Sequence, residues 1–184
     1  METRQWQQTV KGATFLVSTS KDLLPHSFVQ SVFENPAVYW AKKPSQATTK
    51  KLIDNSCTLG LYTINEPTAV PALETTTPIG IARMVTDYTT FAYLTDVFII
   101  DEFRRFGLGK WLIRCCREVI LEEMEDFRWL LLFTGNEQHA HMYQREFGMQ
   151  QLGRSPTGLF SLGAKREQIE AAVLSCSKKD SNIE

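Results

Sequence analysis

Apolar and polar residues follow two different periods along this chain. Apolar side chains recur every three to four positions around Phe28–Phe33 and over Leu108–Ile120, as on the buried face of an amphipathic helix. On the latter segment, Arg114, Arg117, Glu118 and Glu122 fall on the opposite, polar side. Short β-branched and aromatic runs between the helical segments predict strands. The strands are expected at 13–18, 57–62, 79–85, 91–100 and 129–133 with a strand or hairpin in 149–163, and the helices at 25–35, 46–55, 108–122, 137–147 and 164–174.

This order of elements predicts an α/β (α+β) fold with a mixed, mostly antiparallel sheet of six or seven strands and helices on both faces. The strands at 79–85 and 91–100 are expected to form an antiparallel hairpin, because only a short turn-forming segment separates them. The run 129–133 is almost wholly apolar, which is typical of a strand covered on both faces.

Two segments depart from this pattern. Residues 65–78 contain three prolines and several threonines, and predict a surface loop insertion. Residues 177–184 form a polar tail that we expect to be frayed. No composition shift or linker divides the rest, so residues 1–176 are predicted to form a single domain.

Composition narrows the class of protein. The 184 residues carry a formal net charge of −1, so the basic surplus of a nucleic-acid binder is missing. No apolar run reaches the roughly 18 residues needed to cross a membrane, and the polar N-terminus lacks the core of a secretory signal.

The four cysteines form no C-x-x-C pair, which indicates a reducing compartment, the cytoplasm by default, with the nucleus not excluded. His139 and His141 fall on different faces of a helix without a nearby cysteine, so we expect no metal site.

A strand that leads into a glycine-bearing turn and then a helix carries the clearest chemistry. Gly107 and Gly109 allow a ligand to approach the backbone, and the first turn of the helix has N–H groups without intrahelical partners. These features favour an anion site, to which Arg104, Arg105 and Lys110 add positive charge. A tight strand-to-helix connection with solvated arginines explains the same spacing equally well.

The resemblance to a known family is more specific. The run Arg104-Arg105-Phe106-Gly107-Leu108-Gly109 matches the R/Q-x-x-G-x-G/A signature of the GNAT (GCN5-related) N-acetyltransferase superfamily. The likeness extends over about residues 26–163 and resembles a subgroup of small single-domain members of unassigned substrate. Its other parts are 82–88, 91–99, 107–112, Ala140-His141-Met142-Tyr143 and Phe147-Gly148-Met149. The stretch between Phe133 and Tyr143 is longer than usual for the family.

The resemblance implies acetyl-CoA as cosubstrate, no metal, and a sheet that splays between the family's fourth and fifth strands. It implies that the N–H of Val97 polarises the thioester carbonyl, that Tyr143 reprotonates the departing thiolate, and that Asn136 bonds the pantetheine amide. The implied cofactor-binding residues are Val97, Phe98, Ile99, Arg104, Arg105, Phe106, Gly107, Leu108, Gly109, Lys110, Asn136 and Tyr143.

The base that deprotonates the acceptor amine is unassigned. Some relatives keep a glutamate at positions that carry Tyr93 and Thr95 here. Asp96 and Asp87 remain as candidates. The alternative for Asp96 is a buried carboxylate satisfied by backbone donors, and Asp87 suits a hairpin turn.

The acceptor side is predicted to be bordered by Tyr39, Trp40, Arg83, Asp87 and Tyr93. The resulting prediction is direct transfer of acetyl from acetyl-CoA to a primary amine in a ternary complex, with a small molecule favoured. Two alternatives stay open: a protein or peptide acetyltransferase acting on lysine or N-terminal amines, and a CoA-binding sensor with weak catalysis. Exposed edge strands are compatible with a homodimer.

Overall fold

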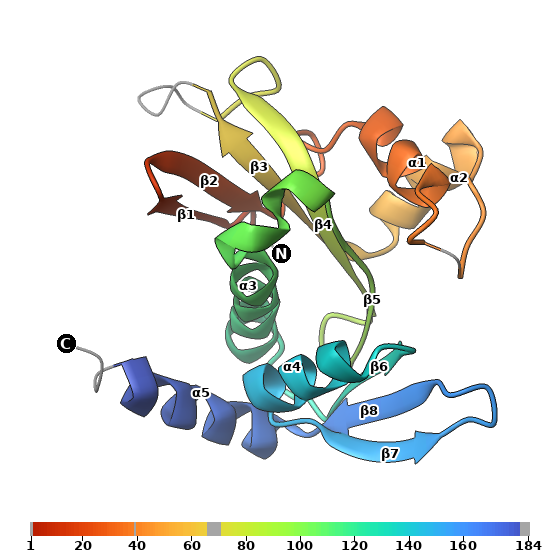
Figure 1. Cartoon of the computed structure of the whole chain (residues 1–184), viewed down its shortest axis with the longest axis vertical. Coiled ribbons are helices and arrows are strands. Elements are labelled where there is room, and N and C mark those ends of the chain that lie inside the picture. The colour runs from red at the N-terminus through yellow and green to blue at the C-terminus, as the bar shows by residue number, and fades with distance from the viewer. Residues whose placement is uncertain (1, 39, 66–70, 181–184) are drawn as a thin grey trace. The chain divides into compact units, whose positions relative to one another are not determined.

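The computed structural model describes residues 2–38, 40–65 and 71–180, with side chains described up to residue 176 (Figure 1). Within these ranges the chain forms an eight-stranded sheet in the order β1-β2-β3-β4-β5-β6-β8-β7. The elements in chain order are β1 Gln5–Val10, β2 Ala13–Ser18, α1 His26–Glu34, α2 Gln46–Asp54, β3 Cys57–Ile64, β4 Thr76–Thr86, β5 Phe91–Ile99, the 3-10 helix η1 Asp101–Phe106, α3 Leu108–Glu123, β6 Trp129–Thr134, α4 Glu137–Phe147, β7 Gln150–Arg154, β8 Phe160–Ala164 and α5 Arg166–Asp180.

The sheet is mixed and mostly antiparallel, as the sequence predicts. Strands β1 to β4 pair antiparallel in chain order, β8 pairs antiparallel with both β6 and β7, and β5 pairs parallel with β6. The strand that sequence reasoning missed is β1. Its residues alternate between exposed and half-buried, so no apolar run marks it, and its register is set by pairing with β2, for example Trp6 opposite Val17.

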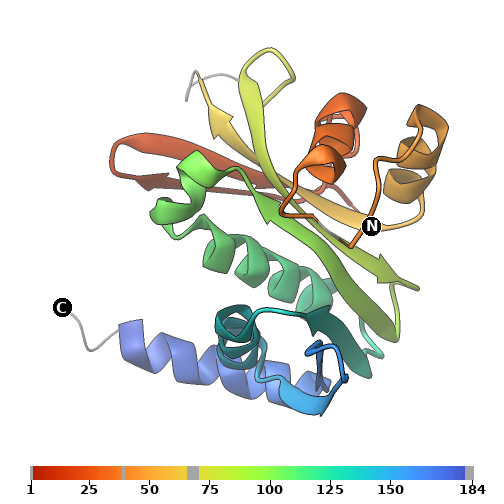
Figure 2. The same cartoon turned by 45° about the vertical axis from the view of Figure 1, so that its right-hand side comes forward.

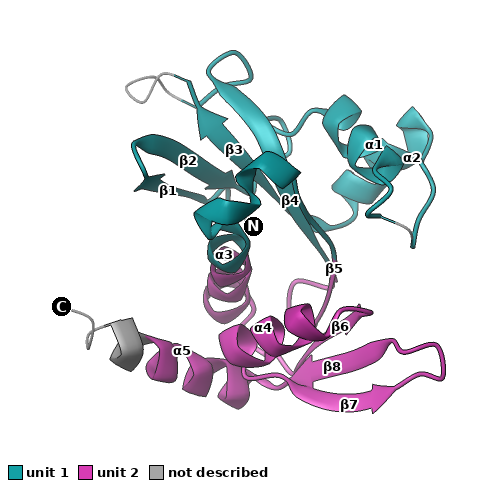
Figure 3. Cartoon of the chain, in the orientation of Figure 1, with its two compact units in different colours: residues 1–84, 96–112 teal, residues 85–95, 113–184 magenta. Residues whose placement is uncertain are grey.

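The chain divides into two compact units, residues 1–84 with 96–112 and residues 85–95 with 113–184 (Figure 3). Several elements contribute to both, because β4, β5 and α3 each continue from one unit into the other.

The first unit has a core between a helix pair and the sheet. Helices α1 and α2 lie side by side (Figure 2), and α2 begins where the Ser45 hydroxyl accepts a hydrogen bond from the Thr48 N–H at 3.1 Å. Pro25 precedes α1 and Asn35 ends it, as predicted. The buried cluster consists of Leu16, Leu23, Leu24, Val29, Val32, Phe33, Val38, Ile53, Tyr62, Ile64, Ile81 and Phe98. Phe98 brings β5 into this core.

The second unit is built around α4, which packs against α5, β8 and β6. Its fully buried side chains include Leu130, Leu132, Phe147, Leu162 and Ile169. α4 ends at Gly148, whose φ of 65° lies in the left-handed region that favours glycine.

The structure corrects the limits of two predicted segments. Thr76, Thr77 and Pro78 belong to β4 rather than to a loop, and Pro78 is tolerated there because it lies at a register shift in the pairing with β3. The rest of the predicted insertion includes residues 66–70, which lie outside the described residues. Helix α5 continues to Asp180, beyond the predicted end at residue 174, because no glycine or proline interrupts it.

The prediction that residues 129–133 are covered on both faces is wrong. Trp129 is 37% exposed and Phe133 is 53% exposed, whereas Leu130 and Leu132 are buried. β6 therefore has one buried and one largely open face. On the open face Trp129 packs over the backbone of Gly163, where an added Cβ would lie 3.2 Å from its ring.

Over the described part of the chain, no helix combines the length and apolar character that a membrane crossing requires.

We predict that Gly148→Ala destabilises the fold more than Gly158→Ala does. Both glycines have positive φ, so alanine costs about 1–2 kcal/mol at either site. A Cβ at Gly148 would also lie 2.4 Å from the Gln168 carbonyl oxygen, whereas no atom lies within 4 Å at Gly158. We therefore expect a loss of about 3 kcal/mol or more for Gly148→Ala, measured by urea unfolding. Equal losses in the two variants would contradict the described packing of α4 on α5.

Candidate functional site

The predicted strand, glycine turn and helix are present, with a short helix added between strand and turn. β5 ends at Ile99, η1 follows over Asp101–Phe106, and Gly107 adopts φ 75° immediately before α3. Gly109 lies in the first turn of α3, and the nearest protein atom to an added Cβ would be Ile99 Cδ1 at 3.7 Å. No protein contact thus requires glycine at position 109, whereas the backbone requires it at 107.

The first turn of α3 can offer backbone donors. The side chain of Leu108 is wholly buried, so this residue can serve a ligand only through its N–H. Phe106 fixes η1 against the core, with its ring centroid 5.5 Å from that of Phe15. Arg105 and Lys110 are exposed.

Arg104 is committed largely to its own loop. Its Nε donates to the Ile99 carbonyl at 3.0 Å, and its guanidinium pairs with Asp101 at 2.7 Å. Its guanidinium also lies 5.9 Å from the centre of the Phe98 ring. The first arginine of the signature therefore stabilises the connection between β5 and η1, and its charge is partly compensated there.

The peptide groups of β5 face two different edges. The Ile100 N–H donates to the Ile79 carbonyl of β4 at 2.9 Å, and the Phe98 carbonyl oxygen lies 2.7 Å from the place of a Cβ on Gly80. Since successive residues of a strand direct their peptide groups to opposite edges, those of Val97 and Ile99 face away from β4.

At its beginning, β5 uses this second edge to pair with β6. The paired residues of β5 are Phe91, Ala92 and Tyr93. Val97 and Ile99, for which the family resemblance implies contact with the cosubstrate, thus lie further along the strand than this pairing.

Asp96 interrupts β5 with an unusual backbone. Its φ of 50° lies in the left-handed region, a conformation that costs a non-glycine residue on the order of 1–3 kcal/mol. Its buried carboxylate accepts from Arg83 Nε at 2.7 Å and from Trp40 Nε1 at 3.2 Å. The structure therefore brings Asp96, Arg83 and Trp40 together, and two side-chain donors bind this buried carboxylate.

The other residues predicted to border the acceptor have different hydrogen-bond partners or packing contacts. Asp87 forms the turn before β5: its carboxylate accepts from the N–H groups of Thr89, Thr90 and Phe91 and from the Thr90 hydroxyl. The Thr90 hydroxyl, followed by the backbone donors, holds the pKa of Asp87 well below its ordinary value. Tyr93 is half-buried, with its ring centroid 5.9 Å from that of Phe133. Tyr39 lies outside the described residues.

Asn136 and Tyr143, for which the resemblance implies contacts with acetyl-CoA, both belong to helix α4 and its N-cap. Asn136 is its N-cap, and the side-chain oxygen accepts from the His139 N–H at 3.0 Å. Tyr143 lies two turns further on and is 8% exposed. Burial, reinforced by the neighbouring Cys116, raises the pKa of the Tyr143 phenol above its ordinary value of 10. The phenol is therefore protonated at neutral pH and able to donate a proton.

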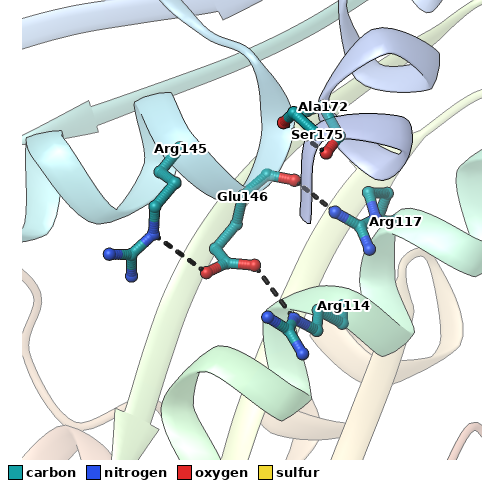
Figure 4. Close-up of polar contacts among 6 residues, drawn as sticks. All are labelled: Arg114, Arg117, Arg145, Glu146, Ala172 and Ser175. Carbon is teal, nitrogen blue, oxygen red and sulfur yellow. Dashed lines mark hydrogen bonds and ion pairs between the residues drawn. The ribbon is translucent and has the colours of Figure 1, made fainter. Parts of the chain in front are cut away.

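A buried glutamate on α4, which the sequence did not indicate, is held by three arginines, two at its carboxylate and one at its backbone carbonyl (Figure 4). The side chain of Glu146 is 1% exposed and accepts from Arg114 Nε at 3.0 Å and Arg145 Nε at 3.3 Å. Arg117 donates to the Glu146 carbonyl oxygen at 2.7 Å.

The polar side predicted for the long helix is thus partly wrong. Arg117 is buried, with 7% of its surface exposed, because its partner lies on another helix. The heptad-like pattern of α3 could not disclose this contact. Arg114 and Arg117 tie the last turn of α4 to α3, one turn beyond Tyr143.

We predict that Glu146→Ala lowers the free energy of unfolding by about 2 kcal/mol, because it removes the ion pairs of the buried carboxylate with Arg114 and Arg145. This value is below that of a fully buried pair, since Arg114 and Arg145 are 36% and 50% exposed and water screens them. Glu146→Gln, whose single side-chain oxygen can still accept from one of the two arginines, should lose less than Glu146→Ala.

Glu170→Ala supplies the matched control for urea unfolding. Glu170 is 52% exposed and pairs with Arg166 at 3.0 Å on the surface of α5, so its loss should change stability by less than about 0.5 kcal/mol. An equal effect of Glu146→Ala and Glu170→Ala would show that the buried cluster contributes no more than a surface pair.

Comparison with known proteins assigns the family. Residues 30–149 match the acetyltransferase (GNAT) family. A provisionally named acetyltransferase of Gibberella zeae is 31% identical over 143 residues, which cover 73% of this chain and 78% of that protein.

Solved structures with this fold agree. A provisionally assigned GNAT acetyltransferase from Xanthomonas campestris pv. campestris is 25% identical, with a TM-score of 0.56 over 78% of this chain and 94% of that one. Spermidine N-acetyltransferase from Vibrio cholerae, solved with CoA and spermine, has a TM-score of 0.59 over 91% of this chain and 97% of that one, and at 12% identity it shows a shared fold alone. The chain therefore belongs to the GNAT family of N-acetyltransferases.

Proposed function

We propose that the protein transfers the acetyl group of acetyl-CoA directly to the primary amine of a small molecule, with both substrates bound together. The proposal rests on the order in which backbone hydrogen-bonding groups occur along β5, η1 and α3. Val97 and Ile99 direct peptide groups away from β4, and the first turn of α3 follows after Gly107. The extended pantetheine arm with its amides can pair with the peptide groups of Val97 and Ile99, and a pyrophosphate can bind the N–H groups of the first turn of α3.

The proposed cosubstrate contacts are mainly backbone contacts. The N–H groups between Arg104 and Lys110 would bind the pyrophosphate, with Arg105 adding charge from an exposed position. Gly109 leaves its surface to the ligand, since no protein atom occupies the place of its Cβ closely. Asn136 caps α4 with its oxygen, and its amide NH₂ group would donate to a pantetheine carbonyl.

The proposed chemistry needs no protein nucleophile. The amine nitrogen attacks the thioester carbon, and the carbonyl oxygen gains negative charge that the Val97 N–H would stabilise. The tetrahedral intermediate then expels the thiolate of CoA, which would take the proton of the Tyr143 phenol. The Tyr143 phenol is neutral before the reaction, as a proton donor must be. The proton released by the amine would return the tyrosine to its neutral form through solvent.

We further propose that the two compact units work as one catalytic domain spanning residues 1–176. The family match covers residues 30–149 and so includes parts of both units.

The test of this function is release of free CoA thiol from acetyl-CoA in the presence of polyamines, amino acids, aryl amines and lysine peptides. We expect turnover with one class of small amine. Turnover with peptides alone would favour a protein acetyltransferase, and tight binding of acetyl-CoA without turnover would favour a sensor. Failure to bind acetyl-CoA would overturn the proposal.

Tyr143→Phe should lower kcat by about 10²-fold, because the leaving thiolate loses its proton donor. KM for acetyl-CoA should change little, since the ring remains. Tyr88→Phe is the matched control: Tyr88 lies in the turn before β5 and is 36% exposed, so kcat should stay within twofold of the wild type. An unchanged kcat in Tyr143→Phe would remove this residue from the chemistry.

Gly109→Ala should weaken acetyl-CoA binding at least tenfold, measured by isothermal calorimetry, because the new methyl group meets the ligand rather than the protein. The fold should be unharmed or stabilised by up to about 1 kcal/mol, since alanine is the better helix former. Gly158→Ala should leave the affinity unchanged. Wild-type affinity in Gly109→Ala would place the pyrophosphate elsewhere.

A further inference from the structure

Asp96 has a backbone conformation that its neighbours must maintain. The described residues other than glycine with positive φ are Lys11, Tyr88 and Asp96. Lys11 lies in the turn between β1 and β2, and Tyr88 in the turn between β4 and β5, where such conformations are common. Asp96 instead lies inside β5. A left-handed residue within a strand persists only where surrounding contacts stabilise it.

Two donors from distant parts of the chain provide these contacts. Arg83, on β4, donates from Nε to one carboxylate oxygen of Asp96 at 2.7 Å, and Trp40, between α1 and α2, donates from Nε1 to the other at 3.2 Å. The Asp96 side chain is 5% exposed and that of Arg83 is 16% exposed, so the ion pair is shielded from water. Both oxygens are therefore held, and with them the orientation of the residue.

The next peptide group depends on this conformation. The dihedral angles at residue 96 set the direction of the peptide that joins it to Val97, and hence of the Val97 N–H. This N–H faces away from β4, because the Ile100 N–H donates to Ile79 of β4, the Phe98 carbonyl lies close to Gly80 of β4, and successive residues alternate between the two edges. A change at Asp96 would rotate this donor.

We propose that Asp96 is a positioning residue, which through Arg83 and Trp40 fixes the strand so that the Val97 N–H points at the thioester carbonyl of acetyl-CoA. The inference rests on the proposed function and deepens it. It reassigns Arg83 and Trp40 from acceptor contacts to the support of the oxyanion donor. It gives the Asp96 carboxylate a structural role, because its two oxygens accept from a guanidinium and an indole.

The experiment reads the carbonyl directly and needs no acceptor amine. Acetyl-CoA labelled with ¹³C at the carbonyl is bound to each protein, and the infrared stretch of the thioester is compared with that of free acetyl-CoA. The proteins are the wild type, Asp96→Asn, Asp96→Ala and the control Asp54→Asn. Asp54 is an aspartate in a surface ion pair with Lys50, remote in role from the site.

The wild type should lower the stretching frequency, because a hydrogen bond polarises the carbonyl. Asp96→Asn should keep at least half of this shift, since asparagine tolerates left-handed φ and its oxygen still accepts a hydrogen bond. Asp96→Ala should lose the shift while binding acetyl-CoA within about threefold of the wild type. Asp54→Asn should match the wild type.

Turnover gives a second readout once an acceptor is known. Asp96→Ala should lose about 10²-fold in kcat with KM for acetyl-CoA within about threefold, and Asp96→Asn less than tenfold. The shape of the pH profile of kcat should be the same in Asp96→Asn and the wild type. If Asp96→Ala does not fold, Asp96→Gly replaces it, because glycine adopts φ 50° without a side chain. Glycine should also lose the infrared shift, because without the carboxylate Arg83 and Trp40 no longer fix residue 96 in that conformation.

The outcomes are separable. Retention of the wild-type shift in Asp96→Ala or Asp96→Gly overturns the positioning role, and so does a wild type that binds acetyl-CoA without any shift. Equal loss of kcat in Asp96→Asn and Asp96→Ala, with loss of the acidic limb of the pH profile, would make Asp96 the base and also overturns it. A wild type that does not bind acetyl-CoA overturns the proposed function itself.

Discussion

The peptide groups of β5 need partners at two edges, since a buried N–H or C=O without a hydrogen bond costs free energy. One edge is served by β4, as the bond from Ile100 to Ile79 shows, and β6 pairs with the beginning of the other. Beyond Tyr93 the second edge carries the groups of Val97 and Ile99. A cosubstrate with its own amides can complete such an edge as an added strand, which explains why the proposed chemistry is carried by main-chain atoms.

Each of the two units contains a buried carboxylate that is fixed by arginine. Asp96 is fixed by Arg83 and Trp40 within the first unit, and Glu146 by the arginines of Figure 4 within the second. In each case a charged group would be costly to bury alone and is stabilised by arginine, which keeps its charge and offers several donors. The carboxylates thus act on geometry. One sits next to Val97 in the chain, and the other lies one turn beyond Tyr143.

The residues of the signature turn divide between architecture and binding. Gly107 is required by its left-handed backbone, Phe106 by its contacts with the core, and Arg104 by its bonds to Ile99 and Asp101. Gly109 has no such internal requirement. Within this motif, Gly109 and the N–H groups of the first helical turn are therefore the best candidates for direct contact with a ligand. Substitutions at the other positions of the motif would disturb the fold as well as binding.

The sequence alone determined the features that depend on residues close together in the chain. Helix limits at Pro25 and Ser45, the glycine turn before α3 and the apolar strand cores follow from local geometry, and the family follows from the motif built on them. Only the tertiary structure decided the exposed face of β6, the strand β1, and the partners of the buried charges. Trp40 and Asp96 are 56 residues apart and Arg117 and Glu146 are 29 apart. Local periodicity carries no information on such pairs, because they are set by how distant elements pack.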